Sequence, residues 1–77
     1  HLNIYPNPAK EVIYIVSEQT LSNVSLIALD GKVHAIEATK KIANNLHSIN
    51  LNDFNPGVYF ITGNCGDQIF REKVIIQ

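Results

Sequence analysis

The sequence predicts an all-β fold, a seven-stranded antiparallel β-sandwich of immunoglobulin-like type. Apolar residues come in short β-branched runs, and turn-forming residues separate these runs at intervals of roughly 8 to 12 positions. No segment shows a helical period of apolar residues. A chain of 77 residues has room for one core, so we expect residues 1–77 to form a single domain. Only the architecture is assigned, because the cysteine pair and the tryptophan of true immunoglobulin domains are missing.

A proline-rich corner separates the first two expected strands. Residues 2–5 read as a short leading strand, and the stretch YPNPAKEVIYI begins at its last residue. Each proline fixes φ near about −65°, removes a backbone donor and biases the residue before it toward extended geometry. We therefore expect residues 5–8 to be a rigid corner. Residues 12–16 follow as a strand that is apolar on both faces, as in the centre of a sheet.

A hairpin is expected in the middle of the first half of the chain. Residues 24–29 read as a strand, and Asp30-Gly31 is a strong signal for a two-residue hairpin turn, because both residues tolerate positive φ. Residues 32–38 should return antiparallel to that strand. Residues 40–45 are polar and rich in asparagine, so they predict a loop.

Three further strands are expected in the second half. In residues 46–51 apolar and polar residues alternate, so we expect a half-buried strand that points Ile49 and Leu51 inward. Pro56-Gly57 then favours a type II turn before the next strand, residues 58–62. Residues 64–67 should turn the chain into the last strand, residues 68–77.

Composition and charge exclude several classes of function. Six Lys and Arg against seven Asp and Glu give a net charge of −1, and neither sign is clustered, so nucleic acid is not an expected partner. No run approaches the roughly 18 apolar residues of a membrane helix, and the N-terminus has no signal-peptide pattern. Because the chain starts at His1 without a methionine, we expect it to be a piece of a longer protein. We expect no membrane insertion of this piece itself.

No constellation of residues predicts catalysis, a cofactor or a metal site. The histidines are His1, His34 and His47, and none is spaced from another ligand type as a metal face requires. Asp30 and Asp53 read as turn residues whose carboxylates bond their own backbone. The lone Cys65 allows neither an internal disulfide nor a multi-cysteine site, and it reads as an incidental exposed thiol at a hairpin tip.

An accessory carbohydrate-binding or adhesive module of a secreted enzyme is the alternative function. Such modules stack aromatic rings on sugar faces, and this chain has no tryptophan. Its aromatic residues lie in or beside expected strands, where core packing is the competing use: Tyr5, Tyr14, Phe54, Tyr59, Phe60 and Phe70.

Four ordered motifs along the whole chain resemble the type A C-terminal sorting domain of the type IX secretion system, also called the Por secretion system. Each motif is weak alone, but their order and spacing are jointly specific. They are Tyr5-Pro6-Asn7-Pro8-Ala9-Lys10, then Gly31-Lys32, then Leu51-Asn52-Asp53-Phe54-Asn55-Pro56-Gly57-Val58-Tyr59-Phe60-Ile61, then Lys73-Val74-Ile75-Ile76-Gln77.

The resemblance implies a non-catalytic address label at the C-terminus of a secreted cargo protein. It implies recognition by the outer-membrane translocon of a Gram-negative bacterium, export through the periplasm, and a secreted or cell-surface location. A sortase-like peptidase would then remove the domain or exchange it for a surface anchor. The expected partners are therefore the translocon, the peptidase and an N-terminally fused cargo domain.

The resemblance also distributes roles among the residues of the motifs. We assign recognition by the translocon to Lys73, Val74, Ile75, Ile76, Gln77, Gly57 and Tyr59. We assign a structural role to Tyr5, Pro6, Asn7, Pro8, Gly31 and Lys32. For the terminal strand, completion of the sheet is an equally good explanation, and for Gly57 and Tyr59 the fold alone is the stronger one. Three features depart from the family pattern: Ala28 where the family often has aspartate, a turn region that often has one more residue in the family, and the presence of Cys65.

Overall fold

The computed structural model describes residues 2–36 and 39–77. Within these ranges, eight β-strands form two four-stranded antiparallel sheets, and no helix is long and apolar enough to cross a membrane. The strands are β1 (Leu2–Tyr5), β2 (Val12–Ser17), β3 (Leu21–Ala28), β4 (Val33–Ala35), β5 (Lys40–Ala43), β6 (Leu46–Asn50), β7 (Gly57–Cys65) and β8 (Gln68–Ile76).

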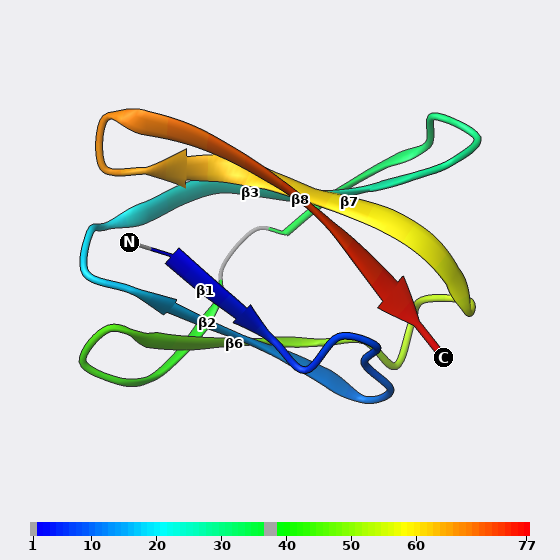
Figure 1. Ribbon diagram of the computed structural model, residues 1–77, viewed down its shortest axis with the longest axis horizontal. Coiled ribbons are helices and arrows are strands. Elements are labelled where there is room, and N and C mark those ends of the chain that lie inside the picture. The colour runs from blue at the N-terminus through cyan, green and yellow to red at the C-terminus, as the bar shows by residue number, and fades with distance from the viewer. Residues whose placement is uncertain (1, 37–38) are drawn as a thin grey trace.

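The two sheets form the layers of a sandwich. One sheet has the strand order β1-β2-β6-β5, and the other has the order β4-β3-β7-β8. Figure 1 shows the first sheet below and the second above, with the chain crossing between them several times. The prediction of an all-β fold with two antiparallel sheets is confirmed. The predicted number of seven strands is wrong, because the described residues contain eight.

The additional strand is β5, in the segment that was expected to be a loop. It pairs antiparallel with β6 at the edge of the first sheet, with Lys40 opposite Ser48. All four of its residues are exposed, so neither face carries the apolar alternation that marks a strand in a sequence. Backbone pairing rather than burial defines this strand, and the turn after it places Asn45 at a φ of 68°.

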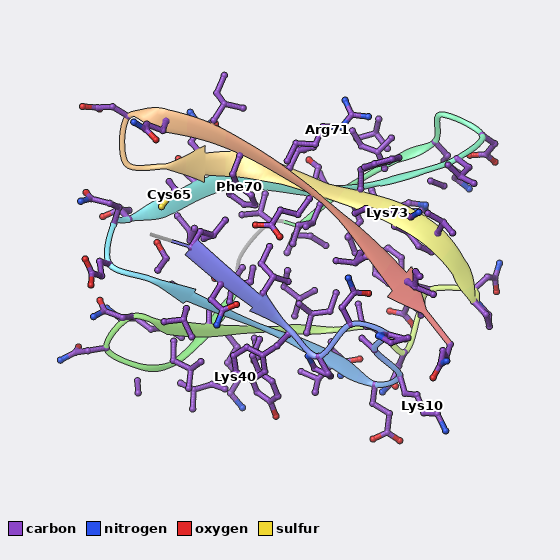
Figure 2. The ribbon with its side chains drawn as sticks, viewed as in Figure 1. Lys10, Lys40, Cys65, Phe70, Arg71 and Lys73 are labelled. Carbon is purple, nitrogen blue, oxygen red and sulfur yellow. The ribbon has the colours of Figure 1, made fainter. Side chains whose placement is uncertain are left out.

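Alternating side chains from both sheets form the core. In β2, Ile13 and Ile15 are buried, while Val12, Tyr14 and Val16 are only half-buried on the outer face. Side chains from the two layers fill the space between the ribbons (Figure 2). The buried apolar residues are Ala9, Ile13, Ile15, Val24, Leu26, Ile49, Leu51, Tyr59, Ile61, Val74 and Ile76.

The expected hairpin around Gly31 exists, but its loop is one residue longer than predicted. The Ala28 N–H donates to the Lys32 carbonyl at 2.9 Å, which closes a loop of three residues. The strand before the loop was predicted to run to residue 29, but in the structure it ends at Ala28. Leu29 therefore lies in the loop, where it is exposed. Gly31 has a φ of 90°, the region in which glycine is favoured. Part of the predicted return strand, residues 37 and 38, lies outside the described residues.

The connections around β7 also differ in detail from the predictions. Ile49 and Leu51 are buried as expected. The chain turns before Gly57, but the φ of Gly57 is 154°, whereas a type II turn needs about +80° at that position. At the other end, β7 continues to Cys65, and only Gly66 and Asp67 separate it from β8. The last turn is therefore two residues long, with Cys65 opposite Gln68.

Candidate functional site

The proline corner and the end of the chain lie side by side, bonded through the side chain of Asn7. The Asn7 amide nitrogen donates to the Lys73 carbonyl at 3.1 Å, and the Ile75 N–H donates to the Asn7 amide oxygen at 3.0 Å. The amide group therefore presents one donor and one acceptor to the outer edge of β8, as the backbone of a neighbouring strand would. The chain bends immediately after β1, as predicted. The peptide bonds before Pro6 and Pro8 are both cis, a feature not predicted from the sequence.

Ala9 continues this pairing with its backbone. Its N–H donates to the Ile75 carbonyl at 2.8 Å, and its carbonyl accepts from the Gln77 N–H at 2.7 Å. Ala9 is buried and forms a parallel bridge with Ile76. We call residues 7–9 the clamp, because they hold the last part of β8 on the side opposite β7. Sequence reasoning missed Ala9, because nothing in the sequence indicates a pairing across almost the whole chain.

The five terminal residues assigned to recognition divide between the two faces of the sheet. Val74 and Ile76 are 1% and 2% exposed and belong to the core. Ile75 is 36% exposed, and Lys73 and Gln77 are also exposed. A partner that approaches the folded domain can therefore contact only alternate residues of this motif, while the others hold the two sheets together.

Gly57 and Tyr59 lie on β7, directly beside the terminal residues. Gly57 is opposite Ile76, and Tyr59 is opposite Val74. The Tyr59 side chain is buried, and its hydroxyl donates to the Asn55 carbonyl at 2.7 Å. These contacts account for Tyr59 through packing and turn closure, and its assignment to recognition stays a prediction.

Gly31 and Lys32 lie away from this region. They belong to the loop between β3 and β4, and β4 is at the opposite edge of the sheet from β8. The Lys32 N–H donates to the Asp30 carboxylate at 2.9 Å, an interaction local to the turn. The structure thus brings together the first and last motifs and places the third beside them, but it leaves the Gly31-Lys32 motif apart.

Replacing Asn7 with alanine should measurably weaken the clamp. The substitution removes two hydrogen bonds to β8, each worth about 0.5–1.5 kcal/mol net, so the free energy of unfolding should fall by about 1–2 kcal/mol. Urea denaturation followed by circular dichroism would measure the change. Asn3→Ala is the matched control at an exposed asparagine of β1, and it should stay within about 0.5 kcal/mol of the parent. Equal losses in both variants would show that the Asn7 bonds contribute nothing specific.

The described histidines are held by local contacts. The His34 ring meets the ring of Phe54 edge-on, with centroids 5.1 Å apart. His47 Nδ1 lies 2.8 Å from the Thr39 hydroxyl oxygen. Within residues 2–36 and 39–77, no three His, Cys, Asp or Glu side chains are grouped as metal ligands would be. His1 lies outside the described residues.

The pKa of His47 is lowered from its usual value of 6.5 by burial and, secondarily, by the positive charge of Lys41. An NMR titration of the folded domain should therefore give a midpoint for His47 below 6.5. Because the unfolded chain binds this proton more tightly, the contribution of His47 to stability is complete above about pH 6.5 and is lost as the pH falls toward the folded pKa. Lys41→Gln should shift the midpoint part of the way back. A midpoint unchanged by that substitution would exclude the Lys41 contribution.

Cys65 is not the exposed thiol that the sequence predicts. It is half-buried as the last residue of β7, and its sulfur lies 3.0 Å from the hydroxyl oxygen of buried Ser17. Ser17 also donates to the Gln19 carbonyl at 2.7 Å, so the thiol rests against a fixed turn between β2 and β3. The environment of the thiol is thus set by residues far away in the sequence.

One family model matches almost the whole chain. It describes the secretion system C-terminal sorting domain and matches residues 3–77, which include all four motifs and both sides of the clamp. The chain belongs to this family. Comparisons with curated proteins and with solved structures gave no significant match. The sorting domains of this family serve type IX secretion, and they act as signals for export rather than as catalytic domains.

The family model covers both of the motifs that the hydrogen bonds of Asn7 join. A sorting domain is fused to a cargo protein and acts with secretion machinery, and its cargo is exported or displayed at the cell surface. The terminal strand of this sorting domain is fixed on both sides, by β7 and by the clamp. Its backbone is thus presented in one defined conformation.

Proposed function

We propose that residues 1–77 form one domain that directs a larger protein, fused before it, across the outer membrane through the type IX secretion system. The family match over residues 3–77 carries this proposal. A sortase-like peptidase then removes the domain or exchanges it for a surface anchor. The two packed sheets also support an immunoglobulin-like relationship, which we keep as part of the proposal.

Recognition in this proposal rests on the exposed half of the terminal motif. Lys73, Ile75 and Gln77 are accessible, while Val74 and Ile76 maintain the strand that presents them. The clamp supports this division because it limits the freedom of the backbone, and an ordered segment loses less conformational entropy when a receptor binds it.

Fusion to a reporter tests the sorting function. Residues 1–77 are placed behind a periplasmic reporter in a bacterium that has this secretion system, and the reporter is measured in the periplasm, at the surface and in the medium. The intact fusion should leave the periplasm, and a fusion that lacks residues 73–77 should remain there. If the intact fusion is retained, the sorting proposal is wrong.

Deletion of residues 73–77 also removes core residues, so a second variant separates recognition from folding. Lys73→Ala combined with Ile75→Ala leaves Val74 and Ile76 in place, and it should reduce export while the purified domain still unfolds cooperatively. Full export of this variant would show that the exposed half of the motif is not read. Mass spectrometry of the exported reporter tests removal by a peptidase, because a reporter that keeps the complete domain contradicts it.

Sugar binding remains the second candidate because of one pair of aromatic residues. Tyr5 and Tyr14 are opposite each other on β1 and β2, with ring centroids 5.5 Å apart and planes inclined by 30°. Burial of the alternate residues places this pair on the outer face of its sheet, where rings could stack on a sugar. Titration of the isolated domain with polysaccharides tests this function, and binding should disappear in Tyr14→Ala. A titration without binding would remove it.

A further inference from the structure

The clamp covers only part of the outer edge of β8. It bonds to the carbonyl of Lys73, to both backbone groups of Ile75 and to the N–H of Gln77. Residues two apart in a strand direct their backbone groups to the same side, so Ile69 and Arg71 direct theirs to this edge as well. Their antiparallel partners on β7 lie on the other side, and among the described residues nothing pairs with the edge from Ile69 to the Lys73 N–H.

The uncovered edge differs from a protected edge in length and regularity. Strand β8 is nine residues long and pairs with β7 in an unbroken register, without proline. Exposed edges of this kind accept additional strands, and positive charges are a common protection against uncontrolled pairing. Ile69 is 83% exposed at the start of this edge, which leaves a large apolar side chain without cover.

On the outer face of this edge the charges are positive, whereas the carboxylates nearby, Glu72 and Asp67, belong to the inner face of β8 and to the turn before it. Arg71 and Lys73, both labelled in Figure 2, lie on the same outer face as Ile75. The Arg71 guanidinium sits 4.5 Å above the centre of the Phe60 ring. Antiparallel pairing of two copies of β8 about Arg71 would place the two Arg71 side chains next to each other. Like charges directly opposite are destabilising, so the charges favour a partner that carries carboxylates over a second copy of this chain.

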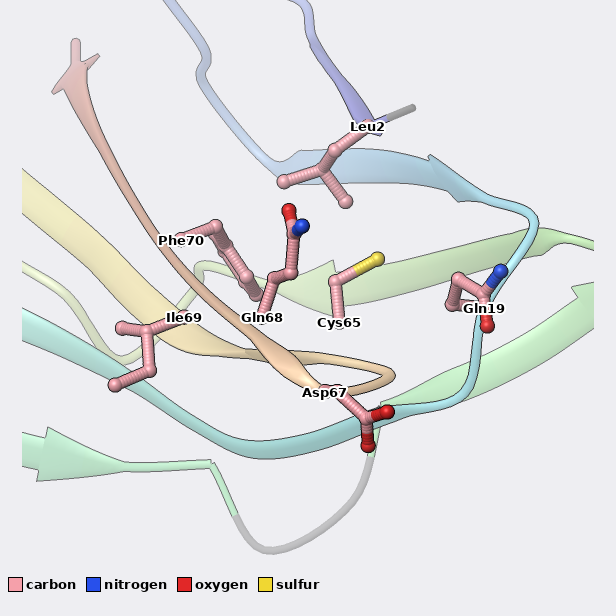
Figure 3. Close-up of a pocket in the computed structure, with 7 residues that line it drawn as sticks. All are labelled: Leu2, Gln19, Cys65, Asp67, Gln68, Ile69 and Phe70. Carbon is pink, nitrogen blue, oxygen red and sulfur yellow. The ribbon is translucent and has the colours of Figure 1, made fainter.

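A hollow of about 410 Å³ lies beside the same edge, on the side that faces the other sheet. Figure 3 shows Leu2 of β1 directed toward Gln68 and Phe70 of β8 across this hollow. The lining is mixed, with Gln19, Asp67 and Gln68 beside the apolar Leu2 and Phe70. A strand added to β8 would direct alternate side chains into this hollow, where an apolar side chain can pack against Leu2 and Phe70. The remaining side chains would lie beside Ile69 and Arg71 on the outer face.

We propose that the uncovered edge of β8, from Ile69 to Lys73, binds an extended segment of a partner protein as an additional strand. The segment alternates carboxylate side chains, which lie beside Arg71 and Lys73, with an apolar side chain that enters the hollow between Leu2 and Phe70. Backbone hydrogen bonds supply affinity in this mode, and the alternating side chains supply specificity. The inference rests on the proposed function, because it names the surface through which the secretion machinery holds the domain.

Proline substitution separates the two sides of β8. The N–H of Arg71 points away from β7, so Arg71→Pro removes a donor from the uncovered edge and leaves the β7–β8 ladder intact. Ala35→Pro is the matched control, since Ala35 directs its N–H away from β3 at the other edge of the same sheet. Arg71→Glu keeps every backbone donor and reverses the charge, which covers the case in which the proline variant does not fold.

The reporter fusion in the secreting bacterium distinguishes the outcomes. Arg71→Pro and Arg71→Glu should each lower the exported amount about tenfold or more, while Ala35→Pro should be exported like the parent. Retention of the parent fusion itself would overturn the sorting function. Export of the parent with undiminished export of Arg71→Glu and of folded Arg71→Pro would overturn the strand-addition proposal alone. Equal loss in Arg71→Pro and Ala35→Pro would also overturn it, because the effect would not be specific to β8.

Discussion

Replacing Ile76 with alanine is expected to lower the free energy of unfolding by about 2–5 kcal/mol, the usual cost of truncating a buried isoleucine. Ile76 is 2% exposed and closes the core near the clamp, where Ala9 lies beside it. A small domain has only a few kcal/mol of stability in total, so the loss is comparable to the whole free energy of unfolding. This variant should therefore be largely unfolded at about 37 °C.

Ile75→Ala is the matched control for this prediction. It truncates the same type of side chain on the same strand, but Ile75 lies on the outer face and its loss should cost about 1 kcal/mol or less. Urea unfolding curves of the two purified variants measure the difference. Both variants should reduce export, but for different reasons. Ile75→Ala should weaken recognition of the folded domain, and Ile76→Ala should unfold it. Similar stability losses in the two variants would contradict the alternation that assigns them to different faces.

Replacing Gly63 with valine is expected to destabilise the domain by about 3 kcal/mol, through overpacking. Gly63 is buried in β7, and a Cβ atom there would lie 2.9 Å from Phe70 Cε2 and 3.2 Å from the Ser22 carbonyl oxygen. The Ser22 oxygen belongs to the backbone of β3, which cannot move without disturbing that strand, and a shift of the Phe70 ring would change its packing beside the hollow. Thermal and urea denaturation would both report the loss.

A double-mutant cycle identifies the Phe70 ring as the obstacle. In a Phe70→Ala background the cost of Gly63→Val should fall to less than half, because one of the two opposing groups is gone. Thr62→Val, on the outer face of the same strand, controls for the general effect of valine and should change stability by less than about 1 kcal/mol. An equal cost of Gly63→Val in both backgrounds would show that the ring does not pack on the glycine, and the shape of the hollow beside Phe70 would need revision.

Most of the strands that the sequence predicts correctly bury one face, whereas the exposed β4 was predicted from the turn before it. Residues 12–16 and 46–51 carry β-branched or alternating apolar residues, and burial of one face selects for that pattern. Strand β5 lacks the pattern because it is an exposed edge, and the same polar residues serve a loop equally well. The extra residue in the loop at Gly31 is similarly hidden, because the same sequence signal fits loops of two and three residues.

The candidate site was harder to predict than the fold. The motifs identify the ends of the chain as important, but they do not show that Asn7 bonds to Lys73 and Ile75. Such a contact depends on how two sheets close, which local spacing does not encode. The same limit applies to Cys65, because the Ser17 side chain that contacts its sulfur belongs to the other sheet.

The separation in sequence between Asn7 and its partners has a consequence for biosynthesis. The two hydrogen bonds join residues 66 and 68 positions apart, so the corner at Asn7 is synthesised well before its partners Lys73 and Ile75. Contacts of such high order form late in folding, after the local hairpins. Premature termination before residue 73 would therefore leave the opening corner without its counterpart, and the translated product would lack a closed terminal edge. In this way the architecture makes closure of the outer edge of β8 depend on the synthesis of residues 73–77.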